Sequence, residues 1–230
     1  MKQKGLSQEV LKLIACVSML IDHIGYSFFP TVLWLRYIGR LAFPIYCFLL
    51  AEGVYYTRSP SRYALRLGIG AVLAEIPFDL LFFRTLTLSH QNVMLTLLLG
   101  FAMLLCMKKT PKLYLQPLWV IPFYLAAEFL NTDYSGRGIL LIALFYLTRP
   151  YHWRFLAQML MLALLFARPD SSGVLPWTAW AVLAMIPIAL YSGRKATSAK
   201  WVQTGFYLFY PVHLVLLFLI RVGIYFAQIT

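Results

Sequence analysis

The stretch VLKLIACVSMLIDHIGYSFF, residues 10–29, is an apolar run interrupted by Lys12, Asp22 and His23. About 20 residues of helix are needed to cross a hydrocarbon core about 30 Å thick, so this run is long enough to span a bilayer. Similar runs recur to the end of the chain, in which 61% of the residues are hydrophobic and only 12% are charged. Soluble domains have about 25% charged residues. The sequence therefore predicts an integral membrane protein.

The remaining apolar runs, divided at their polar breaks, predict an all-α polytopic membrane helix bundle. We expect about nine transmembrane helices, with eight to ten as the range, because the run at 136–148 is short enough to be a half-span. No linker or repeat divides the chain, so residues 1–230 are predicted to form a single integral-membrane domain. The predicted helices cover residues 10–29, 33–56, 63–83, 92–107, 113–130, 136–148, 153–167, 174–190 and 204–226.

The net charge of +12 is explained by the loops and does not indicate binding to nucleic acid. Every second loop, beginning with the N-terminal tail, is rich in Lys and Arg, whereas the opposite loops hold only Arg84, Arg137 and Arg168. Basic loops remain in the cytoplasm, so we expect a cytoplasmic N-terminus and an external C-terminus. The basic start MKQKG is not followed by a cleavage site, and we expect the first helix to be retained.

The sequence lacks the patterns that are typical of metal or covalent catalysis. It has no H-E-x-x-H, no G-x-S-x-G, no glycine-rich phosphate loop and no Asp-rich pair motif. The three cysteines lie in apolar runs without paired spacing, so neither a disulfide framework nor a zinc site is indicated. We expect no bound metal.

Ionisable residues inside the predicted helices are concentrated in the first third of the chain. Each costs roughly 2.5–3.5 kcal/mol to insert at the membrane centre, so the concentration requires ion pairing or a hydrated cavity. It therefore indicates a functional site, with the later helices as a scaffold. These residues are Lys12, Asp22, His23, Arg36, Arg40, Glu52, Glu75, Asp79, Glu128 and Arg221.

Helix geometry groups the first of these residues. Lys12 and His23 are eleven positions apart, which is about three turns, so they share one face and lie about 16 Å apart along the helix axis. A hydrated passage along this face would cross most of the membrane. Asp22 lies about 100° around the helix from His23, and we expect it to meet Arg36 and Arg40 of the next helix.

The third predicted helix and the loop after it add further polar groups. Glu75 and Asp79 share a face four residues apart, and we expect them to converge with the two arginines near His23. Gln91 and Asn92 begin the fourth helix and can both donate and accept hydrogen bonds. All these groups can equally be structural, since buried ion pairs often hold membrane helices together.

The four histidines are expected to play different roles. His23 stands where packing alone would be satisfied by Leu or Phe, so we expect it to take part in catalysis or proton transfer. His213, near Tyr210 on the last predicted helix, is either a wall of the same site or a packed residue. His90 and His152 fall in predicted loops, and we expect ordinary surface roles for them.

Six segments of the chain resemble successive blocks of the TraX family of bacterial polytopic membrane proteins. They are LKLIACVSMLIDHIG at 11–25, LRYIGRLAFPIYCFLLAEG at 35–53, YALRLGIGAVLAEIPFDL at 63–80, QNVMLTLLLG at 91–100, a DY-x-x-x-G segment at 133–138, and GFYLFYPVHL at 205–214. Plasmid-encoded members of that family acetylate the amino terminus of conjugative pilin. The resemblance implies a multi-pass protein of the bacterial cytoplasmic (inner) membrane.

The resemblance also implies kinship with integral-membrane acyltransferases that use cytoplasmic acyl-CoA. That wider group places a basic residue about three turns before a histidine on the first helix, and Lys12 and His23 match the arrangement, with lysine where arginine is usual. An acetyltransferase is implied, in which acetyl-CoA is the acyl donor, Lys12 and Arg36 bind it, and His23 is the general base with Asp22 and Arg40. The acceptor is a peptide, glycan or lipid at the outer face. Residues implied as supporting or acceptor-binding are Glu52, Glu75, Asp79, Gln91, Asn92, Tyr210 and His213.

Two other functional classes remain open. A proton-coupled transporter would also place His, Asp and Arg in the membrane, but transporters usually repeat such groups in both halves of the chain. A non-enzymatic assembly protein of a conjugation or secretion apparatus is the other alternative. Binding of CoA, and its dependence on Lys12, separates the acyltransferase from both.

Overall fold

The computed structural model describes residues 5–151, 153–167, 176–195 and 199–228, and across them it contains helices, turns and two isolated backbone bridges but no strand. Each of the nine predicted ranges contains a helix, so the all-α prediction is confirmed. Three ranges are broken in two, at 33–56, 113–130 and 174–190. The elements are α1 (Gln8–Phe28), α2 (Leu33–Gly39), α3 (Ala42–Tyr56), α4 (Pro60–Phe82), α5 (Val93–Lys109), the 3₁₀ helix η1 (Leu113–Trp119), α6 (Val120–Phe129), α7 (Ser135–Thr148), α8 (Arg154–Phe166), the 3₁₀ helix η2 (Trp177–Ala184), α9 (Met185–Ala189) and α10 (Lys200–Ala227).

Three helical segments of the described chain are long and apolar enough to cross a bilayer. They are Gln8–Phe28, Leu33–Tyr56, which joins α2 and α3, and Trp201–Ala227. The helices Ser135–Thr148 and Arg154–Phe166 and the segment Thr178–Ala189 are apolar but shorter. The structure therefore supports association with a membrane, while nine crossings stay a prediction.

The break between α2 and α3 falls at Arg40 and Leu41. Their backbone N–H groups donate to carbonyls three residues back, at 3.2 Å each, which is a 3₁₀-type bond that ends α2. Because α3 begins at Ala42, Pro44 falls in its first turn, where a missing N–H breaks no helical hydrogen bond. The break leaves Arg36 and Arg40 on a short helical segment that packs against α1.

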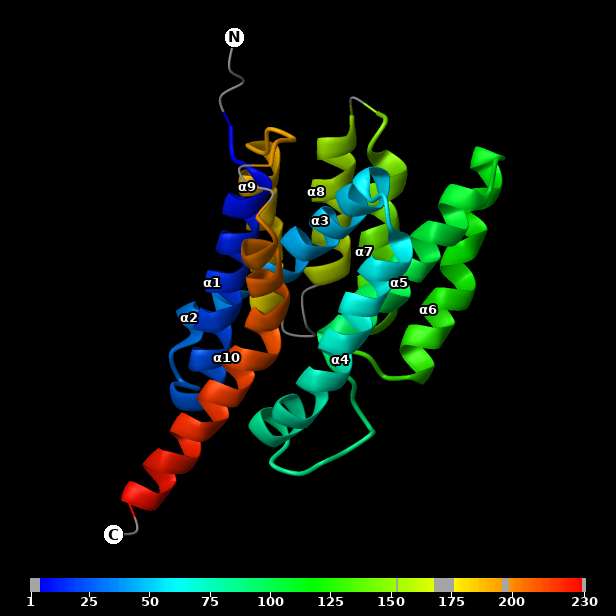
Figure 1. The fold of residues 1–230 in the computed structure, drawn as a ribbon. Helices are drawn as coiled ribbons and strands as arrows, with labels where there is room; N and C mark the ends of the chain where they lie inside the picture. The colour runs from blue at the N-terminus through cyan, green and yellow to red at the C-terminus, as the bar shows by residue number, and fades with distance from the viewer. Residues whose placement is uncertain (1–4, 152, 168–175, 196–198, 229–230) are drawn as a thin grey trace.

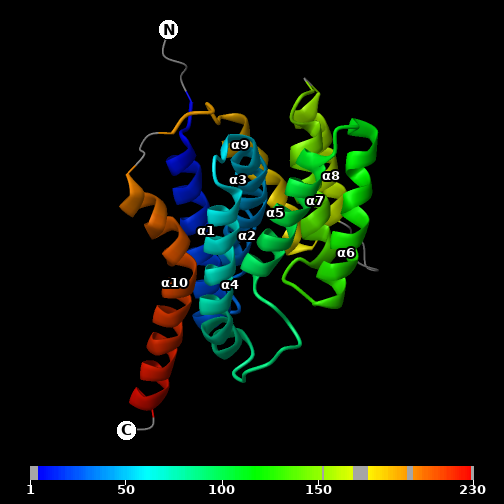
Figure 2. The same cartoon turned by 45° about the vertical axis from the view of Figure 1, so that its right-hand side comes forward.

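The helices are arranged around a central group of three. Figures 1 and 2 show α10 at one edge of the bundle, beside α1 and α4, and α6 at the opposite edge. Between them α3, α5 and α7 pack on one another. These three helices supply many of the fully buried large side chains, among them Ile45, Phe101 and Ile142. The core lies around them, and α1, α4 and α10 enclose one side.

The loops lie at two opposite ends of the bundle. At one end, where α1 begins, the backbone of Leu6 bonds to Leu190 at 2.8 Å and Lys108 Nζ donates to the carbonyl of Val54 at 2.7 Å. We call this the basic end. The opposite end holds loops 83–92 and 130–134 and the end of α10 (Figure 1). The connections α3–α4, α5–η1, α7–α8 and α9–α10 lie at the basic end (Figure 1). By their sequence positions, the residues in or beside these connections include Arg58, Arg62, Lys108, Lys109, Lys112, Arg149, Arg154, Arg194 and Lys195.

Gly100 tests the packing between α5 and α7. A Cβ at this position would overlap the side chain of Ile142, so Gly100→Ala is expected to lower the free energy of unfolding by about 1–3 kcal/mol. The measurement is the melting temperature of the purified protein in detergent. Gly205→Ala in α10 is the control, because a Cβ there meets nothing within 4 Å and alanine favours helix. A Gly100→Ala protein as stable as the wild type would contradict this packing.

Candidate functional site

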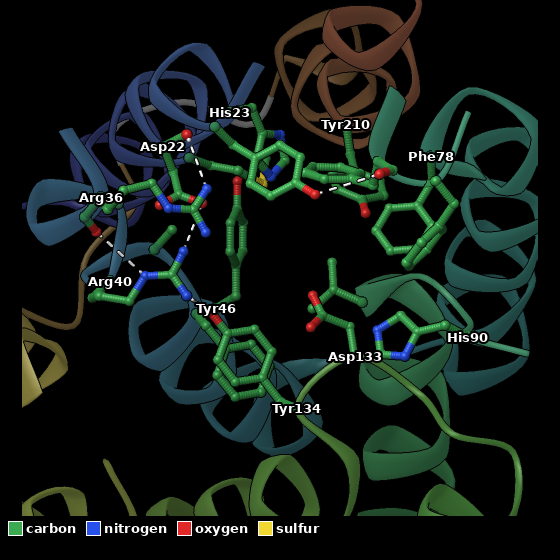
Figure 3. Close-up of a pocket in the computed structure, with 18 residues that line it drawn as sticks. Asp22, His23, Arg36, Arg40, Tyr46, Phe78, His90, Asp133, Tyr134 and Tyr210 are labelled. Carbon is green, nitrogen blue, oxygen red and sulfur yellow. Dashed lines mark hydrogen bonds and ion pairs between the residues drawn. The ribbon is translucent and has the colours of Figure 1, made fainter. Parts of the chain in front are cut away.

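A cavity of about 270 Å³ lies where α1, α2, α3 and α4 meet the two loops opposite the basic end. We call it the His23 cavity. Figure 3 shows a charged side, with Asp22 and Arg40, and an aromatic side, with Phe78 and Tyr210. Histidine, carboxylate, guanidinium and aromatic groups therefore surround one small space.

Asp22 pairs with both arginines at the end of α2. Its Oδ2 lies 2.6 Å from Arg40 Nη2 and 3.3 Å from Arg36 Nη1. Gly39 permits this approach, because a Cβ there would overlap Asp22. The structure confirms that Asp22 meets the neighbouring helix and not His23.

His23 is bonded to His213 of α10 through ring nitrogens, with 2.7 Å between His23 Nδ1 and His213 Nε2. Stacked rings cannot bring ring atoms this close, so the interplanar angle of 11° means that the two rings lie nearly in one plane. On its other side, His213 Nδ1 lies 2.7 Å from the carbonyl oxygen of Phe209. A carbonyl only accepts, so His213 Nδ1 carries a proton.

This chain of hydrogen bonds fixes the tautomers of both rings. In neutral His213 the proton on Nδ1 leaves Nε2 as an acceptor, and His23 Nδ1 must therefore donate to it. Nε2 of His23 then keeps its lone pair, on a side chain that lines the cavity. His213 is buried and lines neither cavity described here. His213 therefore holds the His23 ring through a hydrogen bond without lining the His23 cavity itself.

Sequence reasoning missed three polar loop residues of the His23 cavity. His90 lies in a loop and is partly exposed, as expected, but it also lines the cavity among aromatic rings, which an ordinary surface role does not explain. Asp133 and Tyr134 also line it, and the Tyr134 hydroxyl accepts a hydrogen bond from Arg40 Nη1 at 3.2 Å. Their one sequence signal was the DY-x-x-x-G segment. The prediction for His152 lies outside the described residues.

The carboxylates of α4 accept hydrogen bonds from the loop after α4 and from the start of α5, and neither pairs with an arginine of the described residues. Glu75 accepts hydrogen bonds from the backbone and side-chain N–H groups of Asn92, whose own oxygen caps α5. Asp79 accepts from the backbone N–H of Thr87 at 2.8 Å. The predicted convergence is wrong, because the start of α5 and the loop after α4 supply other donors to these carboxylates. Neither Asn92 nor Gln91 lines a cavity described here.

A second cavity, of about 710 Å³, lies toward the basic end. We call it the Lys12 cavity. Lys12, Arg58, Arg66 and Lys195 contribute to its lining, and Lys12 Nζ donates to Gln203 Oε1 at 2.6 Å. Four cationic groups around one space favour an anionic ligand, above all one that carries phosphate.

Glu52 lines the Lys12 cavity but has a cationic partner. Its Oε1 lies 2.5 Å from Nε of Arg149, and the Arg149 guanidinium also lies 4.1 Å from the ring centroid of Tyr55. These contacts tie α3 to the end of α7, so Glu52 has a structural role at the rim of the cavity.

The two cavities meet at a shared wall. Met19, Tyr46, Val93 and Tyr210 line both of them, and the Tyr46 hydroxyl is hydrogen-bonded to Cys16 Sγ at 3.0 Å. The face of α1 that is predicted to line one passage therefore borders two neighbouring cavities. The face itself is as predicted, with its ends in different cavities.

Arg36 and Lys12 lie in these different cavities. One ligand contacts both residues only if it extends from one cavity into the other, so their joint role in binding acyl-CoA stays a prediction. Within residues 5–151, 153–167, 176–195 and 199–228, no group of three or more His, Cys, Asp or Glu side chains could hold a metal ion.

Comparisons with known proteins find one family and two relatives. The family model described as TraX protein matches residues 7–221. The chain is 30% identical to a probable fimbrial assembly protein, FimC of serogroup H1, from Dichelobacter nodosus, over 90% of this chain and 92% of that protein. It is 33% identical to an uncharacterised protein of Rickettsia prowazekii over 40% of this chain and 34% of that protein. No solved structure matches significantly.

Asp22→Asn tests whether the paired charges hold α1 against α2. The substitution removes the negative charge that two largely buried guanidinium groups share. Breaking a buried ion pair in this way lowers the free energy of unfolding by about 3–5 kcal/mol. We expect a large fall in the melting temperature in detergent. Asp79→Asn is the control, because an asparagine oxygen can still accept from Thr87. Equal melting temperatures for the two variants would show that the Asp22 network contributes no special stability.

Proposed function

The chain belongs to the TraX family, and we propose that it is a membrane-embedded acyltransferase that moves an acetyl or other short acyl group from cytoplasmic acyl-CoA to an acceptor amine or hydroxyl at the outer face. The observation that carries this proposal is the pair of cavities that share one wall. One is cationic and lies toward the basic end, and the other holds an oriented histidine near the opposite end. Donor and acceptor would approach from opposite sides.

The proposed orientation follows from the charge of the loops. Loops rich in Lys and Arg remain in the cytoplasm, so the basic end would face the cytoplasm and the loops 83–92 and 130–134 would face outward. We propose nine crossings of the bacterial inner membrane, with the shorter helices completing the span together with their neighbours.

The Lys12 cavity is the proposed site for the acyl donor. CoA carries phosphate groups, and charge-assisted hydrogen bonds from Lys and Arg are suited to holding them. Its pantetheine arm would follow the face of α1 toward Met19. A small displacement of the Tyr46 and Met19 side chains would open the shared wall, after which the thioester would reach His23.

The proposed chemistry is direct transfer without an acyl-enzyme. Nε2 of His23 takes a proton from the acceptor while the acceptor attacks the thioester carbonyl carbon. Arg40, held by Asp22, stabilises the developing oxyanion. The carbon–sulfur bond then breaks, and the CoA thiolate takes the proton from His23. His213 acts as a positioning residue, because its Nε2 keeps the proton of His23 on Nδ1.

A non-enzymatic role in assembly is the second candidate. It is favoured by the name of the Dichelobacter nodosus relative, a probable fimbrial assembly protein. An acyltransferase that modifies a component of an extracellular fibre would also serve assembly, so the two roles are compatible. Transfer activity separates them.

His23 carries the first prediction from this mechanism. In membranes given radiolabelled acetyl-CoA, His23→Ala should lower transfer of label by about 10²–10⁴-fold, the usual contribution of a general base. His213→Leu should lower it by about 10–100-fold, as expected for a residue that orients another histidine. His213→Gln should recover part of the loss, because the glutamine oxygen can accept from His23 Nδ1. Protein abundance and melting temperature are the controls, and full activity in His23→Ala would remove His23 from the mechanism.

The donor site carries a second prediction. Purified protein should bind CoA, and Lys12→Ala and Arg66→Ala should each weaken binding by about tenfold, because each removes a charge-assisted hydrogen bond worth about 1.5 kcal/mol or more. Arg221→Ala, at the opposite end of α10, is the matched control and should bind CoA as the wild type does. Titration calorimetry in detergent gives the dissociation constants. Unchanged CoA binding in both cavity variants would place the donor elsewhere.

A further inference from the structure

The loop between α6 and α7 is held in an unusual backbone conformation. Asn131, Tyr134 and Ser135 have φ values of 48°, 65° and 43°, in the left-handed region that costs non-glycine residues of order 1–3 kcal/mol each. Such strain persists where the surrounding structure fixes the chain, and it is frequent at functional sites. Asp133 lies in the middle of this loop.

The backbone of Asp133 is fixed on both sides. Its N–H donates to the carbonyl of Gln91 at 2.8 Å, and its carbonyl accepts from the hydroxyl of Thr96. The next residue, Tyr134, stacks on Phe43 with 3.6 Å between ring centroids. The side chain of Asp133 is therefore aimed by the fold, and Figure 3 shows it pointing into the His23 cavity beside His90.

The Asp133 carboxylate forms no ion pair with a Lys, Arg or His side chain of the described residues. Burial raises the pKa of its carboxyl group, although the charges of His90 and Arg40 and the N–H of Tyr134 act in the opposite direction. The two arginines of the cavity are instead paired with Asp22. The side chain of Asp133 is only partly exposed, and a carboxylate that is partly removed from water gains free energy when a cation enters beside it.

The walls around Asp133 suit a cation with an apolar body. Phe78, Phe83 and Tyr210 line the same cavity, and aromatic faces attract ammonium groups within about 6 Å of the ring centroid. A neutral hydroxyl would gain neither the ion pair nor the cation–π contact. The chemistry of this side of the cavity therefore discriminates between the two acceptor classes left open above.

We propose that Asp133 is the acceptor-binding residue of the His23 cavity, and that it holds a primary ammonium group carried on an apolar or aromatic body. The catalytic role of Asp133 rests on the proposed function, whereas binding of an ammonium group by Asp133 does not. Asp133, a loop residue, thus binds the acceptor, while Asp22 pairs with Arg36 and Arg40.

The reaction then has two proton acceptors. The bound ammonium gives one proton to Asp133, which leaves a neutral amine. The amine nitrogen attacks the thioester carbonyl carbon, a carbon–nitrogen bond forms, and the carbon–sulfur bond breaks. The second proton passes from nitrogen to Nε2 of His23 and then to the CoA thiolate. The proton on Asp133 leaves to water, so one ammonium and one acyl-CoA give one amide, one CoA and one proton.

The test uses two probes of nearly equal shape, phenethylamine, which is charged at pH 7, and phenethyl alcohol. Binding to the purified full chain is measured by titration calorimetry in detergent. The wild type should bind the amine at least about tenfold more tightly than the alcohol, the factor expected for one charge-assisted hydrogen bond. Equal binding of the two probes by the wild type overturns the proposal without any variant.

Variants of Asp133 and of a neighbouring carboxylate test which side chain binds the ammonium group. Asp133→Asn should remove the preference for the amine and leave binding of the alcohol within about twofold, and Asp133→Glu should restore part of the preference. Glu128→Gln is the matched control, because Glu128 accepts from the backbone of Gly136 beside the same loop but does not line the cavity. Its preference should remain that of the wild type. Unchanged amine binding in Asp133→Asn overturns the proposal.

Acetyl transfer is measured separately, with acetyl-CoA and phenethylamine as substrates. Loss of amine preference in Asp133→Asn together with absence of transfer by the wild type would support the binding site and contradict the proposed function. Transfer by the wild type that Asp133→Asn retains at the same KM for the amine would contradict the binding site and support the proposed function.

Discussion

The ion pairs of Asp22 with Arg36 and Arg40 are the constraint on which the rest of the site depends. They fix α1 against the short α2, and the absence of a side chain at Gly39 lets the two helices approach this closely. With Asp22 turned toward α2, the next residue, His23, is turned toward α10 and the cavity. The charge network and the histidine pair thus come from one rotation of α1 about its axis.

Much of this geometry follows from helix periodicity. The separation of Asp22 from His23 around α1, the common face of Lys12 and His23, and the gathering of basic loops at one end were all predictable, because each depends on local spacing or charge. The breaks within three predicted helices were not, since apolar composition does not distinguish a continuous helix from one with a 3₁₀ turn. The partners of Glu75 and Asp79 were also missed, because backbone donors from a cap and a loop leave little trace in a sequence.

The loop residues that line the His23 cavity were also not predicted from the sequence. His90, Asp133 and Tyr134 reach the cavity because loops 83–92 and 130–134 bond to one another through the backbone of Gln91, and no periodicity reports such a contact. The similarity to the fimbrial assembly protein extends over 90% of this chain, so it includes these central loops as well as the helices. The similarity therefore covers both the helices and the loops that line the His23 cavity, and is not limited to one motif.

The hydrogen bond between His23 and His213 joins residues 190 positions apart in the chain. Because α1 precedes α10 in the chain, the imidazole of His23 is made well before the residue that orients it. A chain that ends before α10 lacks the histidine that fixes the tautomer of His23. The orientation of the proposed base is therefore set only once α10 has been made.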